Sequence, residues 1–254
     1  MTWHDFVQQT RDLGIDLTPE QIEQFRLYTQ MLMAANRQFN LTALREEEML
    51  LVKYHLDSLS LLPIIARHAG LELAELRNLA WDAVDVGSGG GAPAIPLAIA
   101  WPLLRYTLIE SIGKKARFLR QAVGALGLNV TVVNDRVEVA AHESQHRQHY
   151  HLVTARAVAA LPTLVELTLP LARMGGIVVL PKGPRAQAEL AQAEAAISLL
   201  GGELAGVEEV SVPGEDAARV VIVLRKVAPT PDEYPRRPGL PAKKPLLASP
   251  GRNA

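Results

Sequence analysis

The sequence predicts an α/β fold in which a doubly wound, mostly parallel sheet of seven strands follows a helical extension. Three observations predict it. A glycine-rich turn joins a buried strand to an apolar helix near residue 87, strand and helix patterns then alternate to about residue 200, and two strands follow in succession. Because parallel strands need long crossovers, which are usually helical, such alternation is typical of a parallel sheet.

The glycine-rich turn is the most informative stretch. Residues 82–86 form the expected strand, Gly87-Ser88-Gly89-Gly90-Gly91 the turn, and residues 92–104 the apolar helix. Glycine permits positive φ angles and the close approach of a ligand, which would lie outside the carboxyl end of the strand. The turn fits the G-x-G-x-x-G/A pattern of dinucleotide-binding proteins and the looser G-x-G-x-G of proteins that bind S-adenosylmethionine (AdoMet). It therefore indicates an adenosine-containing cofactor and leaves NAD and AdoMet both open.

Residues 1–70 are predicted to form the helical extension. Thr18-Pro19-Glu20-Gln21 has the pattern of a capping box with proline at the first helical position, and apolar residues then recur at helical spacing. A second helical stretch is expected from residue 46 to residue 62, ending at Pro63.

The sheet is predicted over residues 71–227. The expected parallel strands are 82–86, 106–110, 130–134, 152–155 and 177–180, with later helices at 114–126, 161–172 and 185–200. Two more strands, 207–212 and 219–227, are expected to be joined by a turn at 213–216. An antiparallel strand after five parallel ones fits a methyltransferase sheet better than a six-stranded dehydrogenase sheet, and no second domain for a dehydrogenase substrate follows. Both points favour AdoMet over NAD.

Composition limits the chemistry. The 254 residues are 48% hydrophobic and carry a net charge of −1, so a site for nucleic acid would have to be a local basic patch. Cysteine is absent, which excludes disulfides, thiolate metal sites and a catalytic cysteine. The first 14 residues lack the apolar core of a signal peptide, and the longest apolar run, 92–104, is too short to cross a bilayer. A cytoplasmic, monomeric protein without a membrane segment is expected.

The last segment, residues 228–254, is predicted to be a proline-rich basic tail. Seven prolines fall between Pro229 and Pro250, and from Arg225 onward seven Lys and Arg residues stand against two Asp and Glu. This composition is typical of a solvated tail, and its positive charge equally fits an arm that contacts phosphates.

Three histidines, His142, His146 and His149, have spacings that could place them on one helix face, as a zinc site requires. The residues between them are polar and show no apolar periodicity. A solvated connection without a metal is therefore predicted.

Several short blocks, in order over roughly residues 20–247, resemble one family. The blocks are Asn40-Leu41-Thr42-Ala43, His55-Leu56-Asp57-Ser58-Leu59, Asp85-Val86-Gly87-Ser88-Gly89 with Ile95-Pro96-Leu97, Glu110-Ser111 with Lys114-Lys115 and Arg117-Phe118-Leu119, Ala155-Arg156-Ala157, Lys182-Gly183, and Tyr234-Pro235-Arg236-Arg237-Pro238-Gly239. With these blocks the chain resembles the RsmG (GidB) family, which uses AdoMet to methylate N7 of a guanosine in 16S ribosomal RNA. The sequence departs from the family pattern at Ala92, where a bulky apolar residue is usual, and at Ala94, where glycine is usual.

The resemblance implies a Rossmann-like class I AdoMet-dependent methyltransferase fold. It also implies 16S rRNA, the small ribosomal subunit or an assembly intermediate as the partner. An NAD(P)-dependent oxidoreductase and an RNA-binding module with a vestigial cofactor pocket remain the alternative functions.

The cofactor site is predicted at the strand ends. The glycines would let the backbone lie against the cofactor, and the helix after them would favour the methionine carboxylate. Glu110 ends the second strand, where an acidic side chain accepts hydrogen bonds from ribose hydroxyls. The resemblance places Val137 and Glu138 beside the adenine and Arg156 in the cofactor and catalytic pocket. The full cofactor set is Gly87, Ser88, Gly89, Gly91, Ala92, Glu110, Ser111, Ile112, Val137, Glu138 and Arg156.

Methylation of guanine N7 requires no general base, because N7 presents an exposed lone pair and attacks without losing a proton. Catalysis would consist mainly of alignment, with Arg156 and Lys182 as the candidate catalytic residues. Arg156 could instead only make a salt bridge, and His55 could face the RNA or be buried. RNA contacts are expected from local basic residues, namely Lys114, Lys115, Arg117, Arg120, Arg136, Arg236 and Arg237.

Overall fold

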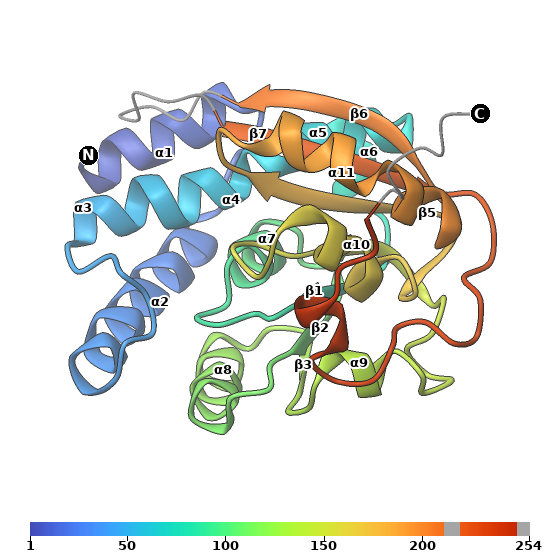
Figure 1. Ribbon diagram of the computed structural model, residues 1–254. Helices are drawn as coiled ribbons and strands as arrows, with labels where there is room; N and C mark the ends of the chain where they lie inside the picture. Colours follow the sequence, from blue (N-terminus) through green and yellow to red (C-terminus); the bar gives the residue numbers. More distant parts are fainter. Residues whose placement is uncertain (211–218, 248–254) are drawn as a thin grey trace, which may run out of the picture.

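The computed structural model describes residues 1–210 and 219–247 and has a seven-stranded sheet at its centre (Figure 1). The strands are β1 (Asp82–Val86), β2 (Arg105–Ile109), β3 (Val130–Val133), β4 (Tyr150–Thr154), β5 (Ala172–Lys182), β6 (Gly202–Val210) and β7 (Arg219–Lys226). Their order in the sheet is β3-β2-β1-β4-β5-β7-β6. β1 to β5 pair in parallel, whereas β7 is antiparallel to both β5 and β6. The predicted fold class is therefore confirmed; the turn expected at 213–216 lies outside the described residues.

Helices precede and connect the strands. The extension contains α1 (Trp3–Asp12), α2 (Pro19–Gln38), α3 (Glu47–Leu50), the π-helix η1 (Leu51–Leu56), α4 (Asp57–Leu59), α5 (Leu61–Ala69) and α6 (Leu73–Arg77). The later helices are α7 (Ala94–Ala100), α8 (Gly113–Leu126), α9 (Val137–Ala140), α10 (Leu161–Thr168), α11 (Ala186–Leu199) and α12 (Leu240–Lys243). The predicted capping box at the start of α2 is confirmed, with reciprocal hydrogen bonds between Thr18 and Gln21.

Different helices cover the two faces of the sheet. Side chains alternate along a strand, so Ile177 and Val179 of β5 belong to one core, and Val178 and Leu180 to the other. The extension, α7 and α8 cover the first core, and α9, α10 and α11 cover the second. The extension thus shares a core with the sheet.

The expected helix end at Pro63 is wrong. Pro63 is the third residue of α5, where its missing N–H would have no partner within the helix in any case. The helix continues to Ala69 and ends at Gly70, whose φ of 71° is a left-handed conformation that glycine adopts without strain.

Two expected helices are too long. The stretch predicted at 92–104 is helical only in α7, because the turn occupies its start and Trp101 precedes Pro102, which disfavours helical conformation at the preceding residue. The helix predicted at 161–172 ends at Thr168, and β5 begins at Ala172 instead of residue 177.

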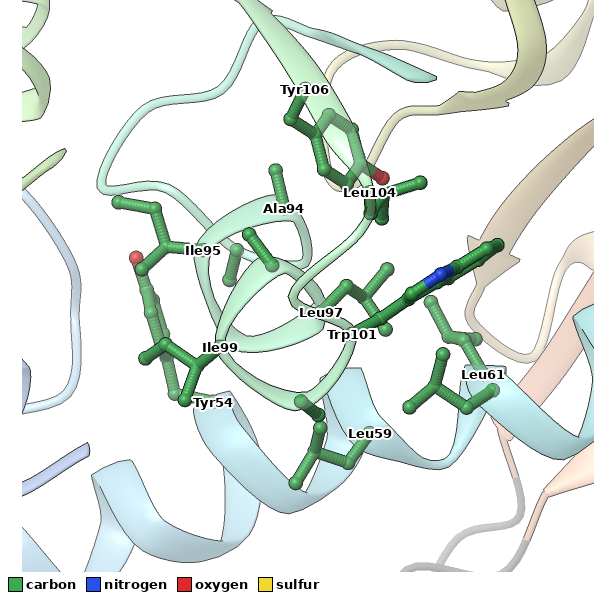
Figure 2. Packing of buried hydrophobic residues seen from close by; sticks show 14 of the residues in the cluster. Tyr54, Leu59, Leu61, Ala94, Ile95, Leu97, Ile99, Trp101, Leu104 and Tyr106 are labelled. Atoms are coloured by element: carbon green, nitrogen blue, oxygen red, sulfur yellow. The ribbon is translucent and has the colours of Figure 1, made fainter. Parts of the chain in front are cut away.

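The segment from α3 to α5, Glu47–Ala69, has the length and the mean hydropathy, 1.4, of a membrane-spanning helix. However, 83% of its most apolar window is buried inside the protein, as in a core helix. Figure 2 shows how its side chains Leu59 and Leu61 pack toward Leu97 of α7 and Trp101, the residue after α7.

The first part of the tail packs on the protein, which contradicts the expectation of a solvated tail; the alternative, an arm that contacts phosphates, stays a prediction. Arg147 donates hydrogen bonds to the carbonyl oxygens of Thr230, Pro231 and Tyr234. The chain then passes α9 and α10 before it forms α12 (Figure 1). Residues 248–254, which complete the predicted tail, lie outside the described part.

The histidine-rich connection is also more packed than predicted. His146 is buried and its Nδ1 lies 2.6 Å from the Tyr150 hydroxyl, while His142 Nε2 lies 2.7 Å from the Pro235 carbonyl oxygen. Within the described residues, no group of three His, Cys, Asp or Glu side chains is placed to hold a metal ion.

Candidate functional site

The glycine-rich turn lies at the carboxyl end of β1. Gly87, Gly89 and Gly91 have positive φ angles of 68°, 56° and 107°. A Cβ atom at Gly87 would lie 2.8 Å from Val158, and one at Gly91 would lie 2.7 Å from the Tyr28 hydroxyl oxygen. At Gly89 it would meet no atom closer than 3.8 Å. The structure therefore fills the space around two of these glycines and leaves the third open to the approach of a ligand.

Glu110 follows β2 and binds this turn. Its side chain is buried, Oε2 accepts a hydrogen bond of 2.8 Å from the Gly89 N–H, and Oε1 accepts one of 2.7 Å from the Ile112 N–H. The structure thus brings the predicted acidic residue into direct contact with the glycine turn. It also gives the carboxylate a structural task that the sequence did not indicate, since two backbone donors depend on it.

A cavity of about 100 Å³ opens beside Gly87, between the ends of β1 and β2 and the start of α9. It is lined by Val86, Gly87, Ile109, Ser111, Asp135, Arg136, Val137, Glu138, Val158 and Leu167. Four predicted cofactor residues, Gly87, Ser111, Val137 and Glu138, therefore meet at one cavity.

Other predicted cofactor residues lie away from this cavity. Ser88 is buried and its hydroxyl donates to the Asp85 carbonyl oxygen, Ala92 is buried, and Ile112 is 44% exposed at the start of α8. Glu110 does not line the cavity either.

The Glu138 carboxylate already has partners. Arg136 Nη2 and the Gly239 N–H each donate to Oε1 at 2.9 Å. Burial raises the pKa of Glu138, but hydrogen bonds from Arg136, from the Gly239 N–H and from its own N–H, together with the positive charge of Arg136, bring the pKa below its usual value. The described part of the tail thereby contacts one of the residues that line the cavity.

A larger cavity of about 580 Å³ lies at the carboxyl ends of β4 and β5. Residues 156–160 after β4 and 181–185 at the end of β5 form its walls. Its charged lining residues are Arg156, Lys182, Arg185, Glu189 and Arg219. Val158 lines both cavities, so this one side chain stands between them.

Arg156 connects the larger cavity to the extension. Its Nη1 lies 2.5 Å from Asp57 Oδ2, and its guanidinium carbon lies 5.2 Å from the centre of the Tyr54 ring in η1. Asp57 Oδ1 also lies 3.1 Å from Arg219 Nε. Arg156 thus forms the salt bridge that the sequence offered as the alternative to a catalytic role, and it also lines the cavity.

Lys182 is held in a similar way. Its Nζ lies 2.6 Å from Glu189 Oε2 and donates a hydrogen bond of 2.9 Å to the Ala159 carbonyl oxygen. This arrangement ties the loop after β4 and the start of α11 to the end of β5.

The predicted RNA-binding residues fall into two groups. Lys114, Lys115 and Arg117 begin α8, and Arg237 is exposed in the tail. Arg136 and Arg236 instead pair with acidic residues: Arg136 with Glu138, and Arg236 with Glu166, whose side chain is 0% exposed. The pairing neutralises the charge of Arg236 and makes it a structural residue of the tail.

His55 is fully buried, which excludes the position facing the RNA. Its Nε2 lies 2.8 Å from the Thr29 hydroxyl, and burial lowers its pKa to about 3. The ring packs among Phe6, Phe25 and Tyr28.

Asp85 is a buried carboxyl group that the sequence reasoning gave no role. It lies in β1 just before the glycine turn, and its Oδ1 accepts a hydrogen bond of 2.7 Å from the Thr154 hydroxyl. Burial raises its pKa to about 7. The available signal was an acidic residue between two valines in the interior of the strand.

Asp85→Asn should stabilise the protein at neutral pH. A carboxyl group whose pKa is raised by folding favours the folded state below its unfolded pKa of 3.8. That contribution is lost as the pH rises toward about 7 and is absent above it. The variant should match the wild type near pH 4 and exceed it at pH 8 by on the order of 4 kcal/mol, and the Asn oxygen can still accept from Thr154. Thermal unfolding across this range measures the difference; a difference independent of pH would contradict the assignment.

The sheet order, the glycine turn and the acidic residue after β2 define a class I methyltransferase fold. The model of a family described as rRNA small subunit methyltransferase G matches residues 21–217. The ribosomal RNA small subunit methyltransferase G of Roseiflexus castenholzii is 45% identical over 235 residues, which are 92% of this chain and 95% of that protein. The protein of the same name from Deinococcus radiodurans is 44% identical over 93% of this chain and 89% of its own length.

Among solved structures, a predicted O-methyltransferase from Agrobacterium tumefaciens is 22% identical with a TM-score of 0.49, over 59% of this chain and 76% of that one. The family model and the curated relatives cover most of the chain. The chain therefore belongs to the rRNA small subunit methyltransferase G family.

Proposed function

We propose that this protein transfers a methyl group from AdoMet to N7 of a guanosine in 16S rRNA of the small ribosomal subunit. The observation that carries the proposal is the family match over residues 21–217, which includes the glycine turn and the loops after β4 and β5. The two adjoining cavities support it, because a methyl transfer requires a cofactor site and a substrate site that meet.

The residues around the smaller cavity fit the cofactor. Gly89 leaves its backbone open to a ligand, Val137 and Ile109 provide apolar walls for an adenine ring, and the Glu110 carboxylate keeps lone pairs for ribose hydroxyl donors. Bound AdoMet would supply an activated sulfonium methyl group. The chain's own residues would then have to place the acceptor nitrogen in line with it.

The larger cavity fits a guanine nucleotide. Four cationic side chains line it, which suits a ligand that carries a phosphate. Its nearby carboxylates are engaged: Asp57 pairs with Arg156, and Glu189 pairs with Lys182. Among the described lining residues, no carboxylate is left to act as a general base. This is consistent with the reaction, because N7 attacks without losing a proton. Because guanine gains positive charge as N7 is methylated, carboxylates that neutralise the adjacent cations would also reduce repulsion.

The test is transfer of a labelled methyl group from AdoMet to small ribosomal subunits and to naked 16S rRNA, alongside binding assays with AdoMet and NAD. We expect AdoMet binding and label in the rRNA. Binding of NAD without AdoMet would favour the oxidoreductase alternative. Binding of AdoMet without transfer to either substrate would favour the RNA-binding module.

Arg156→Lys should lower the kcat of methyl transfer by about 10²-fold. Lysine keeps the charge but lacks the planar guanidinium that contacts both Asp57 and the Tyr54 ring, so the loop after β4 loses its fixed position. Arg67→Lys, which alters an arginine paired with Glu208 outside both cavities, is the control and should leave kcat unchanged. Equal kcat values for the two variants would remove Arg156 from the proposed site.

A further inference from the structure

A groove of about 410 Å³ between α2 and α8, here called the α2–α8 groove, lies outside both cavities described above. It is lined by Met31, Ala34, Ala35, Gln38, Phe39, Lys114, Arg117, Phe118 and Gln121. The lining combines apolar and aromatic side chains with two cations and contains no acidic residue. This mixture differs from both a purely apolar packing defect and a purely charged surface.

The charged side chains of α8 along the groove are all positive. The helix α8 carries Lys114, Lys115, Arg117 and Arg120 in its first eight residues and contains no Asp or Glu. Within residues 1–210 and 219–247, none of these four side chains forms an ion pair with a carboxylate. Positive side chains near a helix N-terminus oppose the helix dipole, so this arrangement lowers helix stability unless an anion binds there.

Phe39 supplies the aromatic surface. It follows the last residue of α2, is partly exposed, and has the Lys114 ammonium 5.5 Å from its ring centre. Aromatic rings beside positive side chains are the recurring elements of surfaces that bind single-stranded nucleic acids, because each base stacks on a ring while its phosphate meets a cation.

Residues that follow and precede the groove in the sequence contact the glycine turn and Glu110. Two residues after Phe39, Leu41 packs against the glycine turn, since a Cβ atom at Gly90 would lie 3.3 Å from Leu41 Cγ. Two residues before Lys114, the Ile112 N–H donates to Glu110. A strand held in the groove would therefore lie near the glycine turn.

We propose that the α2–α8 groove binds an unpaired stretch of the rRNA substrate, with a base stacked on Phe39 and with Lys114 and Arg117 on the neighbouring phosphates. The inference rests on the proposed function for the identity of the RNA, and on the groove itself for the mode of binding. Lys114 has a long, flexible side chain, which moves from the ring to a phosphate when the base takes its place.

Binding of a short labelled single-stranded RNA of mixed sequence, and of the same strand in a duplex, tests the groove. Phe39→Leu keeps an apolar side chain but removes the ring, and should weaken single-strand binding about tenfold while leaving duplex binding nearly unchanged. Phe39→Trp should restore it. The double variant Lys114→Ala with Arg117→Ala should weaken binding of both RNAs and lower the single-strand salt slope by about 1.4, for two phosphates.

Leu27→Ala is the matched control, because Leu27 is an exposed apolar residue of α2 outside the groove. Its RNA affinity should equal that of the wild type, and the Tm of every variant shows whether it is folded. Wild-type affinity in folded Phe39→Leu, or an equal loss for single strand and duplex, would overturn the inference.

Methyl transfer by the wild type, measured in parallel, separates this result from the proposed function. If the wild type methylates rRNA and folded Phe39→Leu keeps its KM for the subunit, only the groove assignment fails. If the wild type transfers no methyl group, the proposed function fails, and loss of single-strand binding in Phe39→Leu still supports the groove.

Discussion

Arg236→Ala should lower the free energy of unfolding by about 3–5 kcal/mol, because it leaves the buried carboxylate of Glu166 without its charge partner. Arg236 Nε and Nη2 donate to the two oxygens of Glu166 at 2.9 and 2.6 Å, and Nη2 also donates to the Lys244 carbonyl oxygen. Arg236 therefore connects two parts of the tail, its own segment and Lys244, to Glu166 of α10. For a chain of this size the loss corresponds to a decrease in Tm of roughly 10 °C.

The neighbouring Arg237 provides the control. Its side chain is exposed, so Arg237→Ala should change stability by no more than about 0.5 kcal/mol. Adding Glu166→Gln to Arg236→Ala should recover part of the loss, since no buried charge then remains. If Arg236→Ala leaves the Tm unchanged and weakens RNA binding in a salt-dependent way, the tail acts as the phosphate-binding arm that the sequence suggested.

Gly91→Ala should lower the free energy of unfolding by about 2–5 kcal/mol, through overpacking and backbone strain together. The added Cβ atom would lie 2.6 Å from Ile95 and 2.7 Å from the Tyr28 hydroxyl oxygen, at a φ of 107°. The Tyr28 hydroxyl cannot move freely, because it donates a hydrogen bond of 2.6 Å to the Gly90 carbonyl oxygen. Denaturant unfolding measures the loss.

Gly89→Ala is the matched variant in the same turn. It introduces no contact closer than 3.8 Å, so its cost should be limited to about 1–2 kcal/mol of left-handed backbone strain. Its added methyl group would occupy the open side of the turn and should weaken AdoMet binding by at least about tenfold. Wild-type AdoMet affinity in Gly89→Ala would contradict the position proposed for the cofactor.

The sheet could be predicted because its signals are local. Four of the five parallel strands are apolar runs followed by a helix pattern, and Gly87 to Gly91 mark the turn after β1. The position of Glu110 followed from the same logic, since the ends of neighbouring parallel strands meet at one edge of the sheet. Pro63 was misleading because a proline stops a helix only after its first turn, and the sequence does not show where that turn begins.

The contacts of the charged residues could not be predicted in this way. Arg236 pairs with Glu166, 70 residues earlier, and Arg156 pairs with Asp57, 99 residues earlier. Periodicity indicates which side chains are buried, but it does not identify the partner of a buried charge. Both residues were expected to meet a ligand, and the structure shows that each is also held by a carboxylate of the protein.

The most direct test of the central claim is the identity of the methylated nucleoside. Small subunits or 16S rRNA labelled by the purified protein and AdoMet would be digested, and the labelled nucleoside identified by mass spectrometry against methylated standards. We expect N7-methylguanosine as the labelled product. Label in any other nucleoside would retain the fold and the cofactor but contradict the proposed acceptor atom and the substrate pocket built around it.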